Sequence, residues 1–220
     1  MKGYYARKIH SLLGLIPLSV FFLMHMFSNF AAVEGGPERF QSAVNLINSL
    51  PLLLLMEIFV IYVPMLYHGV YGLYIAYQAQ PNVGRFNNER NWRYTFQRIS
   101  GVITFVFVIW HVYQTRVQVF LGEVSHEELG ALMHSIVTNP VYFIIYLISV
   151  VAASYHFANG LWAFLVSWGI TRGPRAQRVS SYVCMSLFAV CSIMFVASIF
   201  AFRSVEFDAS AVIEMLKVTV

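Results

Sequence analysis

Charge is scarce in this 220-residue chain: Asp, Glu, Lys and Arg make up 11% of it, whereas soluble proteins carry about 25%. Hydrophobic residues account for 59% of the chain and aromatic residues for 16%. These values exclude an ordinary soluble domain and indicate an integral membrane protein. The net charge of +4 does not indicate nucleic-acid binding, because the basic residues cluster in linkers between apolar segments.

Cysteine is also scarce. Cys184 and Cys191 lie seven residues apart in one apolar segment, which separates them by about 10 Å along a helix, too far for a disulfide. There is no CxxC pair to indicate a zinc or iron–sulfur site, and no flavin, nucleotide or phosphate motif. The sequence shows no internal repeat and no second domain, so residues 1–220 are expected to form one transmembrane domain.

Long apolar segments dominate what is present. Five of them reach the length of about 20 residues that a membrane-spanning helix needs. The prediction is an all-α integral membrane protein with spans at 11–33, 52–79, 99–121, 140–169 and 179–203. The first segment lacks a small-residue cleavage pattern and is expected to remain as a helix. Pro17 and Pro64 fall inside spans, where neighbouring helices can satisfy the freed carbonyl groups.

The linkers alternate in charge. Ten of the fourteen basic residues lie in one set: Lys2, Arg7, Lys8, Arg85, Arg90, Arg93, Arg98, Arg172, Arg175 and Arg178. The other set is mainly acidic: Glu34, Glu38, Glu123, Glu127, Glu128, Glu206, Asp208 and Glu214, with Arg39 and Lys217 among them. The positive-inside rule therefore predicts a cytoplasmic N-terminus in a multi-pass cell-membrane protein, with the first four helices forming a bundle.

Two outer segments are expected to form short surface helices. Residues 123–137 are amphipathic and carry His126 and His134, which are expected to be solvated and are excluded as ligands. The tail after Phe207 is expected to be a similar element.

Four histidines lie deep inside four separate apolar segments: His25, His68, His111 and His156. Ionisable residues inside a membrane are rare, costly and usually functional. Counted from the predicted outer ends, His25 and His111 lie 9 and 12 residues deep, whereas His68 and His156 lie 17 and 16 residues deep. At about 1.5 Å per residue the first two form an outer pair and the others an inner pair, although counting from the cytoplasmic ends separates the pairs less well.

Two pairs of imidazoles from facing helices are typical of the axial ligands of two haems. Zinc fits less well, because no carboxylate or cysteine accompanies the histidines. The alternative is four separate histidines with ordinary hydrogen bonds. Small residues near the histidines could leave space for a flat ring: Gly14, Gly69, Gly72, Gly101 and Gly160.

Other polar residues are candidates for the haem propionates or for a quinone. His10, Ser11, Gln97 and Arg98 lie at the predicted cytoplasmic ends and could bind propionates, although Arg98 could equally be a membrane anchor. Glu57 is a lone carboxylate eleven residues before His68, and it is a candidate for quinone proton transfer or for a structural hydrogen bond to a neighbouring helix. Asn29 and Asn48 could bond a quinone carbonyl or cap a helix.

Several stretches resemble the di-haem cytochrome b membrane anchor of Gram-positive, Bacillus-type succinate dehydrogenases. They are RKIHSLLG (7–14), SLPLLLLMEIF (49–59), YHGVYGLYIAY (67–77), RNWRYTFQRISGVITFVFVIWHV (90–112), HFANGLWAFLVSWGIT (156–171) and PRAQR (174–178). The resemblance implies two haems b, ligated by His25 with His111 and by His68 with His156. It also implies flavoprotein and iron–sulfur subunits on the cytoplasmic face and menaquinone as the electron acceptor.

The chain departs from the family pattern at two places. Some related fumarate reductases carry a glutamate beside the histidine of the fourth helix, where this chain has Ser154 and Tyr155, and relatives with an acid before SLP would differ at Asn48. Three alternatives remain: the same subunit of a quinol:fumarate reductase, the haem b anchor of a hydrogenase or formate dehydrogenase, and a haem-free transporter or structural membrane protein.

Overall fold

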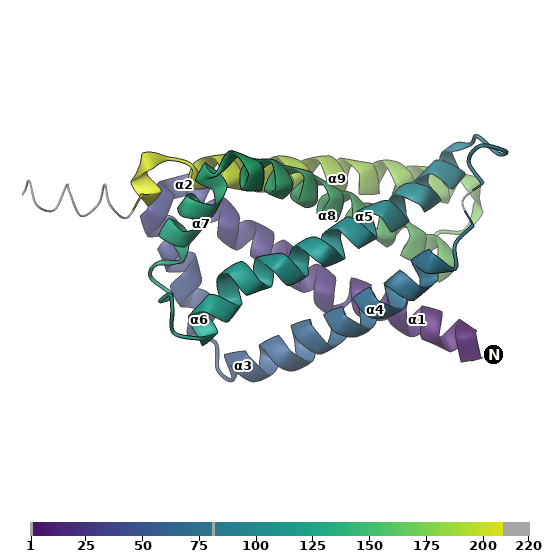
Figure 1. The fold of residues 1–220 in the computed structure, drawn as a ribbon. Coiled ribbons are helices and arrows are strands. Elements are labelled where there is room, and N and C mark those ends of the chain that lie inside the picture. The colour runs from purple at the N-terminus through teal and green to yellow at the C-terminus, as the bar shows by residue number, and fades with distance from the viewer. Residues whose placement is uncertain (1, 81, 209–220) are drawn as a thin grey trace, which may run out of the picture.

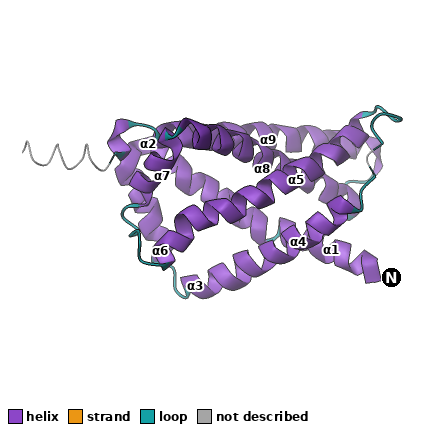
Figure 2. Ribbon diagram, viewed as in Figure 1, coloured by secondary structure: helices purple, strands orange, loops and turns teal. Residues whose placement is uncertain are grey.

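The computed structural model describes residues 2–80 and 82–208, which form helices joined by short loops, with no strand among them (Figures 1 and 2). Five helical stretches are long and apolar enough to cross a membrane: Gly3–Asn48, Leu53–Tyr77, Glu89–Phe120, Pro140–Ser167 and Gly173–Phe202. The predicted all-α membrane fold with five spanning helices is therefore confirmed.

Three of the five stretches are interrupted by changes in helical geometry. The first consists of α1 (Lys2–Leu15) and α2 (Pro17–Asn48), the second of α3 (Leu53–Met56), η1 (Glu57–Tyr62) and α4 (Val63–Tyr77), and the third of α5 (Glu89–Val112), η2 (Tyr113–Val117) and α6 (Gln118–Phe120). The remaining elements are α7 (Leu129–Thr138), α8 (Pro140–Ser167), α9 (Gly173–Phe202) and the short 3₁₀ helix η3 (Val205–Phe207).

Prolines account for two of these interruptions. The first break separates α1 from α2 at Pro17, where the hydroxyl of Ser19 donates to the carbonyl of Gly14 at 3.1 Å. In the second stretch, the wider turns of the π-helix η1 immediately precede Pro64. Local adjustments of this kind let a spanning helix contain a residue without an N–H group.

The first helix continues beyond its expected end at residue 33. Gly36 has a φ of +60° and a ψ of −150°, and this turn separates the spanning part of α2 from residues 37–48. Phe40 and Val44 of the latter segment are buried in a cluster with Met133 of α7 and Phe207 of η3. The segment therefore covers one end of the bundle.

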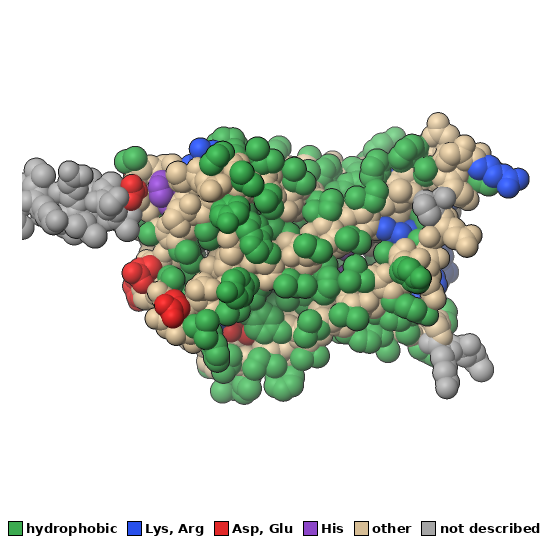
Figure 3. Space-filling view, viewed as in Figure 1, with side chains coloured by type: hydrophobic (Ala, Val, Ile, Leu, Met, Phe, Trp, Pro, Cys, Tyr) green, Lys and Arg blue, Asp and Glu red, His purple; other side chains and the backbone are tan. Residues whose placement is uncertain are grey.

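The helices pack unevenly around the bundle. Helix α8 packs along α9 and α5, α2 also packs against α9, and α1 packs against α4. Buried side chains between them include Met26, Tyr146, Cys191 and Phe195. Apolar side chains also cover the outer midsection, as Figure 3 shows, where lipid would surround them.

Charged side chains collect at the two ends of the bundle. Acidic groups lie near the turn in α2 and near α6 and α7, and basic groups lie at the end that holds the N-terminus (Figures 1 and 3). We refer to these as the acidic end and the basic end. Their separation agrees with the alternation of the linkers, while the cytoplasmic location of the basic end stays a prediction.

The predicted surface helix over 123–137 is wrong in its extent, because only α7 (Leu129–Thr138) is helical and residues 123–128 form a loop. The N–H of Ser125 donates to Glu128 at 2.8 Å, and this hydrogen bond lowers the pKa of the Glu128 carboxyl. His134 is not simply solvated, since its Nδ1 donates to the carbonyl of Phe202 at 2.9 Å. The tail predicted to follow Phe207 lies outside the described residues from 209 onward.

Candidate functional site

The four partly buried histidines come from four different helices and lie in two pairs. His25 of α2 faces His111 of α5 with 5.9 Å between the ring centres and 68° between the ring planes. His68 of α4 faces His156 of α8 at 6.1 Å and 80°. The two pairings are those expected from the depths of the residues along their helices.

The pairs lie at different heights in the bundle. His68 contacts His10, which belongs to α1 near the basic end, and His156 contacts Gln97, in the third turn of α5. His111 lies nine residues before the end of α6, toward the acidic end. We therefore call His68 and His156 the basic-end pair, and His25 and His111 the acidic-end pair.

The hydrogen bonds of three imidazoles fix which ring nitrogen is free. Nδ1 of His68 lies 2.9 Å from the carbonyl oxygen of His10, and Nδ1 of His156 lies 3.0 Å from that of Gln97. A carbonyl oxygen only accepts hydrogen bonds, so each Nδ1 carries the hydrogen. The amide nitrogen of Gln97, which lies 3.2 Å from Nδ1 of His156, therefore donates to the His156 carbonyl instead. Each Nε2 consequently keeps its lone pair, as a metal-binding histidine requires.

His111 reaches the same state through a side chain. Its Nδ1 lies 3.0 Å from the hydroxyl of Tyr146, which is 3.3 Å from Oε1 of Gln114. The single hydroxyl hydrogen goes to Gln114, because that oxygen only accepts, so Tyr146 accepts from His111. His25 differs, since Nδ2 of Asn29 lies 3.3–3.4 Å from its ring nitrogens and donates to its carbonyl at 2.7 Å.

Two glycines make room for the basic-end pair. A Cβ atom at Gly14 would collide with the His68 ring, and one at Gly101 would lie 2.7 Å from Cε1 of His156. The other glycines expected to leave space for a ring face different groups: Gly69 faces Phe105, Gly72 faces His10 and Gly160 faces Gln97. The absence of a side chain at Gly14 and Gly101 therefore lets the rings of His68 and His156 lie directly against the neighbouring helix backbones.

The geometry fits haem better than a metal ion held by protein ligands alone. Two imidazoles that bind one metal ion from opposite sides at about 2 Å each hold their ring centres about 6 Å apart. Within residues 2–80 and 82–208, no group of three or more His, Cys, Asp or Glu side chains could hold a metal ion. Two ligands suffice for haem iron, because the porphyrin supplies the remaining nitrogens.

The polar residues expected at the haem edges lie in several environments. The His10 ring stacks on the His68 ring at 4.1 Å with 5° between the planes, and Ser11 accepts a 3.4 Å hydrogen bond from Trp168. Arg98 lies over its neighbour Tyr94 at 3.2 Å and donates to that residue's carbonyl. Of the propionate candidates, His10 and Gln97 contact ligand-candidate histidines directly.

Glu57 makes a hydrogen bond to a neighbouring helix, which is one of the two roles that the sequence left open for it. Its Oε2 accepts hydrogen bonds from Nη2 of Arg116 at 2.8 Å and from Nε at 3.2 Å. The two residues lie in the π-helices η1 and η2, a geometry that is frequent at functional sites. Asn48, the other residue considered near this end, is the last residue of α2.

Comparison with known proteins agrees with this arrangement. Residues 77–199, more than half of the chain, match the family described as "Succinate dehydrogenase/Fumarate reductase transmembrane subunit". The chain belongs to this family. The "Succinate dehydrogenase cytochrome b558 subunit" of Bacillus subtilis (strain 168) is 42% identical over 202 residues, which cover 91% of this chain and 98% of the relative. The resemblance expected from the sequence motifs is confirmed.

In this transmembrane subunit, sequence reasoning overlooked several residues around the histidines. Arg116 follows His111 by five residues inside an apolar segment, so the cost of a charge inside a membrane indicates a functional role for it as for Glu57. Arg93 belongs to the basic linker residues in the sequence, but in the structure it is only 7% exposed. Tyr146 and Asn159 are single polar groups inside α8 and are 2% exposed each, which the sequence alone did not distinguish from ordinary packing.

Proposed function

We propose that the chain is the cytochrome b membrane anchor of a succinate dehydrogenase, and that its paired histidines hold two haems b. The observation that carries the proposal is the pair of facing imidazoles at each of two heights, with ring centres 5.9 and 6.1 Å apart. The family membership and the cytochrome b558 relative support it. A hydrogenase or formate dehydrogenase anchor and a haem-free transporter find no such support.

The proposed ligand atoms are the Nε2 nitrogens of His68, His111 and His156, together with a ring nitrogen of His25. Carbonyl oxygens hold the rings of His68 and His156, and the Tyr146 hydroxyl holds the ring of His111. Groups that orient a ligand in this way fix the ring and make its free nitrogen more basic. When bound, the two haems would carry single electrons along the membrane normal.

We propose that the basic end binds the flavoprotein and iron–sulfur subunits. The exposed side chains there include Arg85, Arg90, Arg172 and Arg175, which suit an acidic partner surface and a cytoplasmic location. Succinate oxidation is the proposed direction, because the curated relative is a succinate dehydrogenase subunit. Fumarate reduction is the reverse of the same path, and the family description includes it.

At the acidic end we propose a menaquinone site beside Glu57 and Arg116. The carboxylate is largely buried, with 14% of its side chain exposed, and Arg116 holds it as an ion pair. Arg116 is a hydrogen-bond donor for a quinone oxygen, and Glu57 Oε2 is a proton carrier once the ion pair opens. Asn29, one turn from His25, offers a further amide donor in the same half of the bundle.

The first test is a reduced-minus-oxidised visible spectrum of the purified membrane complex, combined with the haem-to-protein ratio. Two low-spin haems b per chain are expected. One haem per chain would mean that one histidine pair has another role. A colourless complex with intact subunits would overturn the proposal and favour the haem-free alternative.

A further inference from the structure

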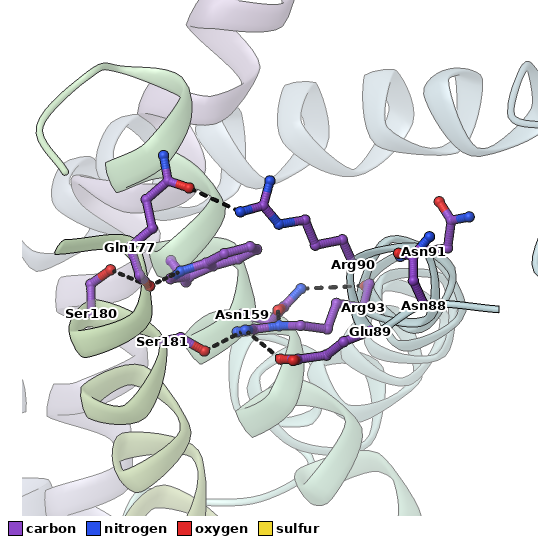
Figure 4. A network of polar contacts seen from close by, with 10 residues as sticks. Asn88, Glu89, Arg90, Asn91, Arg93, Asn159, Gln177, Ser180 and Ser181 are labelled. Carbon is purple, nitrogen blue, oxygen red and sulfur yellow. Dashed lines mark hydrogen bonds and ion pairs between the residues drawn. The ribbon is translucent and has the colours of Figure 1, made fainter. Parts of the chain in front are cut away.

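A buried cation is linked by hydrogen bonds to the basic-end pair of histidines. Arg93 is 7% exposed, and its guanidinium lies over the ring of Trp162, 3.9 Å from the ring centre. Figure 4 shows how Arg93 points from α5 toward Asn159 of α8 and Ser181 of α9. Burying a cation away from water is costly unless it is well paired, so a buried guanidinium is a candidate for a functional role.

A continuous series of hydrogen bonds joins Arg93 to His156. Nε of Arg93 donates to Oδ1 of Asn159 at 2.8 Å, and Nδ2 of Asn159 donates to Oε1 of Gln97 at 2.7 Å. Nε2 of Gln97 then donates to the carbonyl of His156 at 3.0 Å, while the Gln97 carbonyl accepts from Nδ1 of His156 at 3.0 Å. Two residues, Asn159 and Gln97, therefore link the guanidinium to the imidazole, and the last bond uses the backbone carbonyl of Gln97.

The cation at one end and the carbonyl groups at the other fix the direction of the bonds in the series. A guanidinium only donates, so the oxygen of the Asn159 amide must face Arg93 and its nitrogen must face Gln97. The amide nitrogen of Asn159 only donates and the carbonyl of His156 only accepts. The oxygen of the Gln97 amide therefore faces Asn159, and its nitrogen faces His156. A neutral residue in place of Arg93 would remove the charged donor that holds Asn159, while the bond from Gln97 to the His156 carbonyl would keep its direction.

The charge of Arg93 is only weakly compensated. Its Nη1 donates to the Ser181 hydroxyl at 2.5 Å and lies 3.5 Å from Glu89, whose side chain is 81% exposed. An ion pair with so exposed a partner contributes little. Nη2 is buried and has no hydrogen-bond partner within the described part of the chain. The group consequently brings net positive charge into the interior close to His156.

We propose that Arg93 is a positioning residue for His156, acting through Asn159 and Gln97, and that its charge raises the reduction potential of the haem at the basic end. The inference rests on the proposed ligand role of His156. A nearby positive charge favours the reduced iron, which carries one positive charge fewer. The basic-end haem would then accept electrons readily from subunits docked on that face.

The test is a redox titration of both haems in the complete purified complex, followed by visible and electron paramagnetic resonance spectroscopy. In Arg93→Gln the potential of the basic-end haem should shift to more negative values and its resonance should move, with the other haem unchanged. Arg93→Lys keeps the charge and should retain most of the potential. Arg203→Gln is the control, because it removes the same charge from an exposed side chain that lies over the Phe143 ring at the acidic end, away from the proposed docking surface.

A second variant keeps the inference testable if Arg93→Gln does not assemble. Asn159→Leu retains the cation and breaks the series, so it should move the resonance of the basic-end haem alone. Unchanged potentials and spectra in every variant that assembles would overturn the inference. A His156→Leu complex that keeps both haems would instead overturn the proposed function, so the two failures are distinguishable.

Discussion

The Tyr146 hydroxyl accepts a 3.0 Å hydrogen bond from Nδ1 of His111, whereas carbonyl oxygens accept the corresponding bonds from His68 and His156. The acidic-end pair thus depends on a side chain that a single substitution can alter. The carbonyl groups at the other pair cannot be removed in this way. This difference makes the two proposed haem sites separable by mutation.

Tyr146→Phe should weaken the acidic-end site and leave the basic-end site intact. Phe fills the same buried space, and the lost hydrogen bond costs about 1 kcal/mol of stability. Loss of a group that orients a metal ligand typically lowers affinity about 10–100-fold. The effect is measured from the visible spectrum, as the loss of haem on dilution or on addition of a competing haem-binding protein in its haem-free form. Tyr142→Phe is the matched control, because Tyr142 lies one turn before Tyr146 on α8 and its ring packs against Trp110.

The histidines should behave as two pairs. His25→Leu and His111→Leu are each expected to remove the same spectral component, because either change leaves one axial ligand. His68→Leu and His156→Leu should each remove the other component. Low-temperature difference spectra of the four variants, with haem counted per chain, distinguish the components. Loss of one shared component in His25→Leu and His68→Leu would contradict the pairing.

Much of the architecture follows from hydropathy and charge. Five apolar segments predict five helices, because only satisfied backbone can cross a membrane, and the alternating linkers predict which residues share an end. The rise per residue then ranks the histidines by depth, and residues of like depth lie together in the structure. Their role as ligands stays a prediction.

The individual side-chain contacts between helices could not be predicted in the same way. The stacking of His10, a propionate candidate, on His68 is one example, because it depends on how α1 packs against α4. Arg93 could not be distinguished from the other basic residues near its helix end, because hydropathy says nothing of the direction in which a side chain turns. The ion pair between Glu57 and Arg116 depends on helix rotations that the two π-helices alter locally.

Substitutions at the two residues of the Glu57–Arg116 ion pair should have different effects, one on quinone turnover and the other on stability. Glu57→Gln keeps a hydrogen-bond acceptor for Arg116 and is expected to lower succinate:menaquinone activity with both haems retained. Arg116→Leu leaves a largely buried carboxylate without its partner and should cost about 1–3 kcal/mol. Thermal unfolding in detergent and quinone-reductase assays measure the two effects.

The double variant provides the check on this assignment. Glu57→Gln combined with Arg116→Leu removes the unpaired charge, so the complex should be more stable than Arg116→Leu alone. Turnover equal to that of the unaltered complex in Glu57→Gln would remove Glu57 from the quinone site.

Gly14 and Gly101 should be required for the basic-end site, although alanine is the better helix former. Exchange of glycine for alanine inside a helix ordinarily gains about 1 kcal/mol of stability. Here the added Cβ would strike the ring of His68 or His156, so Gly14→Ala and Gly101→Ala should each lose the basic-end haem and retain the other. Gly3→Ala is the control on the same helix as Gly14, since nothing lies within 4 Å of a Cβ at that position. Full haem content in both Gly14→Ala and Gly101→Ala would contradict the prediction. It would show that haem binding does not require the rings of His68 and His156 to lie against these helix backbones.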